Sequence, residues 1–177
     1  GHIDFSADVE RSLSVLDAAI LVISAVEGVQ AHTENIFLAL KEFEIPTLIF
    51  INKIDRLGGD VDRVWAEIRS DLGIDIAVLQ KQDKEGEGEK TSIVSIWNSS
   101  YQEETIIESI ANSNDVMLVK YLEGKVLPFA ELDAALIQSF QENKKVPLLM
   151  GAAKLELGVE SLMDAAIHYL PAAKGDI

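Results

Sequence analysis

The feature that most constrains the fold is an apolar run that ends abruptly in a polar loop. Residues 47–51 read Thr-Leu-Ile-Phe-Ile, and residues 52–55 follow at once as Asn-Lys-Ile-Asp. A short continuous apolar run is typical of a strand that is buried on both faces of a parallel sheet. Because ligands of such sheets bind at the carboxyl ends of the strands, the loop at 52–55 is the first candidate site.

This loop carries the groups needed to recognise a guanine ring. The carboxylate of Asp55 offers two coplanar acceptors, which match the ring N–H and the exocyclic amine on one edge of guanine. Adenine lacks that pair of donors, and a site built around such a contact rejects the analogue by roughly 10⁴- to 10⁵-fold. Asn52 can tie the loop to its neighbours, and the alkyl stem of Lys53 can cover the base. Taken alone, the four residues are equally well explained as a surface turn.

Helical and strand patterns alternate on either side of this loop. Continuous apolar runs predict three buried strands, and a 3.6-residue apolar period predicts four helices. The expected strands are residues 18–26, 47–51 and 146–150, and the expected helices are residues 8–16, 33–43, a segment from Asp60 or Asp62 to Gly73, and 159–170. Strands that alternate with helices in this order predict an α/β fold with a parallel sheet.

The segment that precedes the strand at 146–150 interrupts this alternation. Residues 74–79 and 91–97 predict two strands of a small antiparallel sheet, separated by a polar loop at 80–90. Two helices are expected after them, at 115–122 and 129–141. The sequence therefore predicts a core made of residues 1–79 and 146–177, with an inserted α+β subdomain at 80–145.

A second loop at the end of a buried strand supports the interpretation of the first. Residues 151–154 read Gly-Ala-Ala-Lys, and small residues there let the backbone approach a flat ligand closely. The backbone N–H of Ala153 can donate to the carbonyl oxygen of guanine, whereas the amine of adenine cannot accept it. By itself this sequence most often forms a tight turn between a strand and a helix. Together with residues 52–55, it favours a guanine site.

Charge and composition limit the classes of partner. Fifteen Lys and Arg against thirty Asp and Glu give a formal net charge of −15, so direct binding of nucleic acid by this segment is not expected. The chain has no cysteine, and no apolar run approaches the length of a membrane span. His2, His32 and His168 show no metal-ligand spacing. We expect a soluble cytoplasmic protein that does not bind a membrane.

Further motifs resemble those of a known family. Residues 1–5, Gly-His-Ile-Asp-Phe, resemble the tail of the Asp-x-x-Gly-His-x-Asp-Phe switch element of translational GTPases. Residues 11–55 resemble the elongation factor G branch, closest to the tetracycline-resistance ribosomal-protection proteins, and residues 28–33 and 113–124 support that narrower match. The resemblance implies part of a P-loop GTPase-type parallel sheet. It also implies binding of GTP or GDP with Mg²⁺, and hydrolysis of GTP on the ribosome that releases tetracycline.

The resemblance assigns roles to individual residues. Gly1 matches the glycine whose N–H meets the γ-phosphate, and His2 matches the catalytic histidine that positions the attacking water. The loop at 52–55 matches the guanine-specificity loop of the family. Ala153 and Lys154 match its second base-contacting loop. The resemblance therefore implies a guanine site formed by Asn52, Lys53, Asp55, Ala153 and Lys154.

Other parts of the family's machinery do not occur in these 177 residues. There is no Gly-x-x-x-x-Gly-Lys-Ser/Thr phosphate loop, and the switch residues that would bind Mg²⁺ are also absent. Because the chain opens in mid-motif at Gly1, we expect a truncated GTPase core that binds GTP weakly or not at all and hydrolyses none measurably by itself. The phosphate-loop strand would lie beside residues 18–26, so we expect an open apolar edge there and a homodimer or swapped assembly.

Two alternatives remain open from the sequence. The chain can derive from an ordinary translocation factor of the elongation factor G type, since the contacts with the drug site lie in other domains of the family. It can also be a non-catalytic α/β interaction module that keeps the guanine-reading loops and binds a partner through its acidic insertion. The residues that precede Gly1 would distinguish an interaction module from an enzyme, because an enzyme requires a phosphate loop there.

Overall fold

The structure is a computed structural model that describes residues 12–13, 15–84, 88–95, 104–112 and 114–173. Most of the helix expected at 8–16 lies outside these residues. Both switch candidates, Gly1 and His2, also lie outside them.

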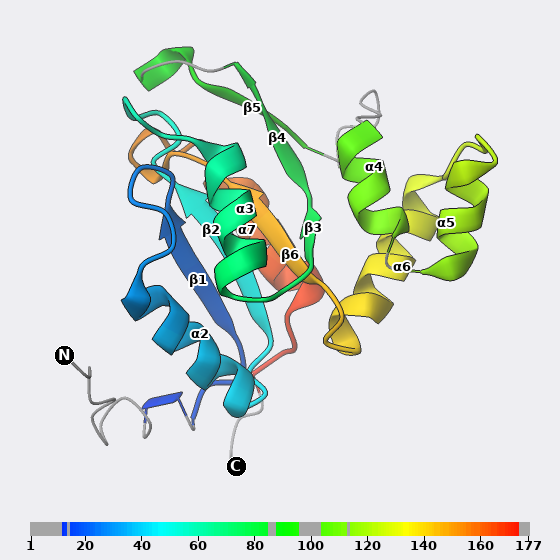
Figure 1. Cartoon of the computed structure of the whole chain (residues 1–177), viewed down its shortest axis with the longest axis horizontal. Coiled ribbons are helices and arrows are strands. Elements are labelled where there is room, and N and C mark those ends of the chain that lie inside the picture. Colours follow the sequence, from blue (N-terminus) through cyan, green and yellow to red (C-terminus); the bar gives the residue numbers. More distant parts are fainter. Residues whose placement is uncertain (1–11, 14, 85–87, 96–103, 113, 174–177) are drawn as a thin grey trace.

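Four parallel strands form the main sheet, in the order β1-β2-β6-β3 (Figure 1). They are β1 (Ala19–Ser24), β2 (Thr47–Asn52), β6 (Val146–Met150) and β3 (Ile76–Val78). All three neighbouring pairs are parallel. Three of these strands coincide with the apolar runs of the sequence, which confirms the predicted α/β fold with a parallel sheet.

Helices cover both faces of this sheet. The helices α2 (Ala31–Glu42) and α3 (Val61–Asp71) lie on one face, and α7 (Val159–Tyr169) lies on the other (Figure 1). Asp60 caps α3, because its carboxylate accepts a hydrogen bond of 2.9 Å from the backbone N–H of Arg63. None of the described helices has the length and apolar composition needed to cross a bilayer.

In its described residues, the stretch between β3 and β6 contains a ribbon and three α-helices. The strands β4 (Gln80–Lys84) and β5 (Ser92–Ser95) pair in antiparallel fashion, with a short 3₁₀ turn, η1 (Gly88–Lys90), between them. The helices are α4 (Glu104–Ala111), α5 (Asp115–Leu122) and α6 (Phe129–Gln141). The two helices expected at 115–122 and 129–141 are confirmed, whereas α4 was not predicted.

The expected pairing of residues 74–79 with residues 91–97 is wrong. β3 joins the main sheet beside β6, and β5 pairs instead with β4, which lies in the segment expected to be a loop. Burial explains the difference, since the three residues of β3 are at most 2% exposed and fill both faces of a covered sheet. The residues of β4 are polar, and a two-stranded ribbon can pair through its backbone without an apolar pattern.

One apolar core joins the sheet to the helices of this stretch. Leu148 and Leu149 of β6 belong to the same buried cluster as Ile110 of α4 and Leu136 of α6. A polar contact reinforces the packing, because the backbone N–H of Val78 donates to Ser109 Oγ at 3.2 Å. The helices α4 and α6 therefore pack directly against the sheet that carries the candidate site.

Candidate nucleotide-binding site

The carboxyl ends of β1, β2 and β6 lie side by side. Ser24 is in register with Asn52, and Ile51 is in register with Met150. Beyond the strands, the backbone N–H of Gly151 donates to the carbonyl oxygen of Ile51 at 2.8 Å. The loops at 52–55 and 151–154 are therefore adjacent, as the position of both at strand ends predicts.

Asn52 links the two loops through a single oxygen. Its Oδ1 atom accepts hydrogen bonds from the backbone N–H groups of Lys53, at 2.8 Å, and Ala153, at 3.0 Å. The predicted tying role of Asn52 thus has a defined geometry. The Ala153 N–H, which the sequence assigns to a guanine carbonyl, donates to Asn52 in this structure. A carbonyl oxygen at the site must share that donor or replace Asn52 as its acceptor.

Lys53 is held in an uncommon backbone conformation. Its φ angle is +66°, in the left-handed region that residues other than glycine rarely adopt. Such conformations cost free energy and cluster at sites of function. Its ammonium group lies 3.4 Å from Glu27 Oε1, and about half of each side chain is exposed. The bend at Lys53 therefore turns the chain directly after β2 and sets the direction of this side chain.

Asp55 is the buried acid of the site. It is 7% exposed, and its Oδ2 atom lies 3.7 Å from Arg56 Nε, which is longer than a hydrogen bond. Burial of a carboxylate is costly unless donors compensate for its lost hydration. Asp55 borders a cavity of about 570 Å³, a volume within the range typical of sites for small molecules. The arrangement can accept a pair of adjacent donors from a ligand in that cavity.

All five residues predicted to contact guanine line this cavity. They are Asn52, Lys53, Asp55, Ala153 and Lys154. Four further lining residues were not predicted, namely Val26, Glu27, Arg56 and Leu57. Glu27 was recoverable from the sequence, because it follows the apolar run at 18–26 and the strand-end rule applies to that run as well.

Gly151 has a packing role that differs from the expected one. A Cβ atom at this position would lie 2.2 Å from the carbonyl oxygen of Leu157 and 2.8 Å from the ring of Phe50. The glycine is therefore needed because the chain folds back onto itself after β6. Close approach to a ligand, which the sequence suggested, is not required to explain it.

Among the described residues, no group of three or more histidine or acidic side chains is arranged to hold a metal ion. The absence of Mg²⁺ ligands from the whole chain stays a prediction from the sequence.

Comparison with known proteins identifies the family. The family model described as "Elongation factor Tu GTP binding domain" matches residues 1–172, which is nearly the whole chain. The chain belongs to this family of GTP-binding domains. The match confirms the resemblance to translational GTPases.

Resistance proteins are among the relatives of this GTP-binding domain. It is 36% identical to the tetracycline resistance protein TetP of Clostridium perfringens over 176 residues, which cover 99% of the chain and 27% of that protein. It is 43% identical to the tetracycline resistance protein TetM of Staphylococcus aureus over 164 residues, which cover 93% of the chain and 24% of TetM. The narrower resemblance to resistance proteins is thereby confirmed. The chain spans about a quarter of the length of these relatives.

A solved structure shares the fold of the domain. A crystal structure of a protein from Thermus thermophilus superposes with a TM-score of 0.75 over 97% of this chain and 29% of that one, at 23% sequence identity.

Proposed function

We propose that this GTP-binding domain recognises guanine through Asn52, Lys53, Asp55, Ala153 and Lys154. The observation that carries the proposal is the buried carboxylate of Asp55, which borders the cavity with its charged neighbour Arg56 at 3.7 Å. The ring N–H and the exocyclic amine of guanine would supply the two hydrogen bonds that such a carboxylate needs. Adenine would leave the acid desolvated and unpaired, so the cavity favours guanine.

The activity of the complete protein is part of the same proposal. Its GTPase reaction would use the N–H of Gly1 at the γ-phosphate and His2 to position water, with Mg²⁺ and the phosphates held mainly by residues outside these 177. By itself the chain would bind GTP weakly or not at all and hydrolyse none measurably, because phosphoryl transfer depends on positioning and charge stabilisation by those parts. The likeness to tetracycline resistance proteins supports release of tetracycline from the ribosome as the purpose of hydrolysis.

The organisation of the chain follows from this function. We propose that residues 1–79 and 146–177 form the part of the GTPase core present here, and that residues 80–145 form an insertion before the last core strand. The two base-reading loops both belong to the core, on either side of the insertion.

Replacing Asp55 with asparagine tests guanine recognition. The substitution exchanges one acceptor oxygen for an NH₂ donor, which opposes the guanine amine but suits the carbonyl oxygen that xanthine has at the same position. We expect Asp55→Asn to weaken binding of fluorescent mant-GDP by at least about a hundredfold and to gain binding of xanthosine diphosphate. The affinities for the two nucleotides are measured by competition with mant-GDP, in the complete protein in which the chain occurs. Asp62→Asn, an exposed acid on α3, is the matched control. Unchanged mant-GDP affinity in Asp55→Asn would contradict the proposal.

Expression in tetracycline-sensitive bacteria separates the two enzymatic alternatives. We expect the complete protein to raise the inhibitory concentration of tetracycline several-fold, and the Asp55→Asn variant to lose that effect. A protein that instead replaces a depleted translocation factor and leaves tetracycline sensitivity unchanged would favour the elongation factor G alternative.

A further inference from the structure

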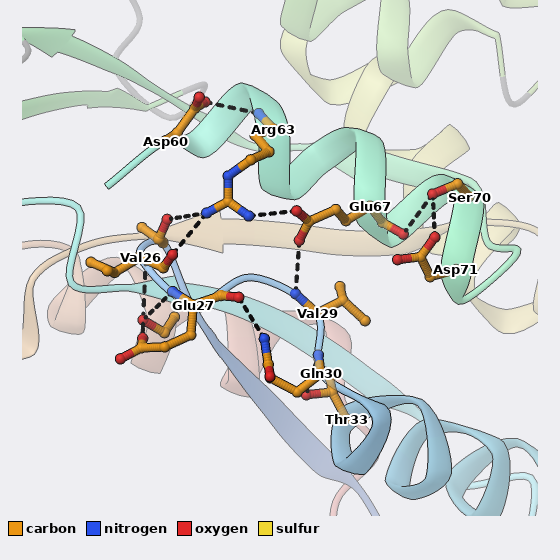
Figure 2. Close-up of polar contacts among 12 residues, drawn as sticks. Val26, Glu27, Val29, Gln30, Thr33, Asp60, Arg63, Glu67, Ser70 and Asp71 are labelled. Atoms are coloured by element: carbon orange, nitrogen blue, oxygen red, sulfur yellow. Dashed lines mark hydrogen bonds and ion pairs between the residues drawn. The ribbon is translucent and has the colours of Figure 1, made fainter. Parts of the chain in front are cut away.

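The loop between β1 and α2 is held against α3 by one arginine and one glutamate (Figure 2). Arg63 Nη2 donates to the carbonyl oxygens of Ala25, at 3.1 Å, and Val26, at 2.9 Å. Glu67 Oε2 accepts the backbone N–H of Val29 at 2.8 Å, and its other oxygen pairs with Arg63 Nη1. We call this pair the Arg63–Glu67 clamp. It spans the loop by contacts with main-chain atoms at both ends.

The clamp and the loop approach each other more closely than a side chain on the loop would allow. Gly28 lies between the clamped residues with a φ angle of +70°. A Cβ atom on Gly28 would lie 2.0 Å from Glu67 Oε2 and 2.6 Å from Arg63 Nη1. A residue with a side chain would therefore displace both members of the clamp, in addition to straining the backbone.

The clamped loop is also a wall of the proposed guanine cavity. Val26 and Glu27 line that cavity, and Glu27 lies 3.4 Å from the ammonium group of Lys53. The backbone on the other side is fixed too, because the N–H of Ala25 donates to the carbonyl oxygen of Asn52 at 2.8 Å. Displacement of the loop would therefore move Glu27 away from Lys53 and change the wall that faces the base.

An ordinary surface ion pair does not explain this arrangement. Glutamate and arginine four residues apart can stabilise their own helix without contact to any other element. Here both side chains are partly buried, and three further hydrogen bonds go to a loop 37 or more residues away in sequence. Loss of Arg63 would leave two carbonyl groups without this donor, so the loop would gain freedom.

We propose that Arg63 and Glu67 are positioning residues for guanine-nucleotide binding, which act through the β1–α2 loop on Lys53. The inference rests on the function proposed above for the cavity. The inference adds a support on α3 that fixes the β1–α2 loop before a ligand arrives. A wall that is already ordered raises affinity, because binding does not have to supply the free energy of ordering the loop.

The test compares variants of the complete protein in which this chain occurs. Mant-GDP dissociation is timed by stopped flow, amide hydrogen exchange is followed at residues 25–30, and thermal unfolding is recorded. We expect Arg63→Ala and Gly28→Ala to speed both the dissociation of mant-GDP and the exchange of the loop amides. The expected increase in the rate of dissociation is about tenfold. Arg63→Lys, which keeps the charge but not the fork, should lie between Arg63→Ala and the wild type. Arg69→Ala, an exposed arginine of the same helix, should change neither.

The outcomes distinguish the inference from the function on which it rests. Faster exchange in Arg63→Ala with unchanged mant-GDP dissociation would overturn the inference and leave guanine binding intact. Unchanged exchange in Arg63→Ala would overturn it as well, because the clamp would then not hold the loop. A wild-type protein that binds mant-ADP as well as mant-GDP would overturn the proposed function and the inference together. If Gly28→Ala fails to fold, Arg63→Ala and Arg63→Lys still decide the question.

Discussion

At the scale of single residues, two acidic side chains make defined contacts, one at the strand-end cavity and one between two helices. Asp55 borders the cavity at the carboxyl ends of the strands. Asp133 of α6 lies against α7, where one of its oxygens accepts the hydroxyl of Tyr169 at 2.8 Å and the other lies 2.8 Å from His168 Nε2. Asp133 therefore joins a helix that precedes β6 to the helix that follows it.

Tyr169 makes this junction sensitive to alkaline pH. Burial, together with the hydrogen bond to Asp133 and the charge of that residue, raises the pKa of the Tyr169 hydroxyl above its ordinary value near 10. Because the folded pKa lies above the unfolded one, the contribution of Tyr169 to stability is complete below about pH 10 and is lost as the pH rises further.

We therefore expect Tyr169→Phe to lower the free energy of unfolding by about 1 kcal/mol at pH 8, through loss of the hydrogen bond. Above pH 10 the difference between wild type and variant should shrink. Urea denaturation at pH 8 and pH 11 measures both values, and absorbance of tyrosinate reports ionisation. The control Tyr121→Phe removes a hydroxyl that lies 3.4 Å from Glu104. It should lower the free energy of unfolding at pH 8 by a smaller amount. A constant difference across the two pH values would contradict the expectation.

Residue patterns predicted the two loops that line the cavity, but not the contacts of α3 with the neighbouring loop. Asn52, Asp55 and Ala153 were recoverable because a strand end fixes where each loop lies in a parallel sheet. Arg63 and Glu67 were not, because their pattern on α3 is that of an ordinary helical ion pair. Their contacts with the β1–α2 loop depend on the approach of two elements, which no local spacing encodes.

At the scale of elements, burial decided which predictions succeeded. The strands at 47–52 and 146–150 and the helix at 129–141 have strong apolar patterns, and the structure confirms them. β4 was missed because its residues, Gln-Lys-Gln-Asp-Lys, need no apolar face in a two-stranded ribbon. β3 was assigned to the wrong sheet because three buried residues fit either a central or an antiparallel strand. Sheet membership depends on tertiary packing, which such a short pattern cannot specify.

At the scale of the whole molecule, β1 ends the described sheet on one side. β2 is its only neighbour among the described strands. Alternate residues of β1 differ in burial, since Leu21 and Ile23 belong to the core whereas Ile20 is 40% and Val22 is 56% exposed. An apolar edge strand of this kind is a template for pairing with another chain.

We expect the isolated chain to self-associate through the β1 edge, as a homodimer or a swapped assembly. Val22→Lys should shift the equilibrium toward the monomer, because a charged side chain on an edge strand opposes pairing with a second strand. Val116→Lys, which removes an apolar side chain that is 65% exposed on α5, should leave association unchanged. Light scattering coupled to size-exclusion chromatography measures the mass of each variant across a range of concentrations. A wild-type chain that remains monomeric at the highest concentration would show that the β1 edge does not pair.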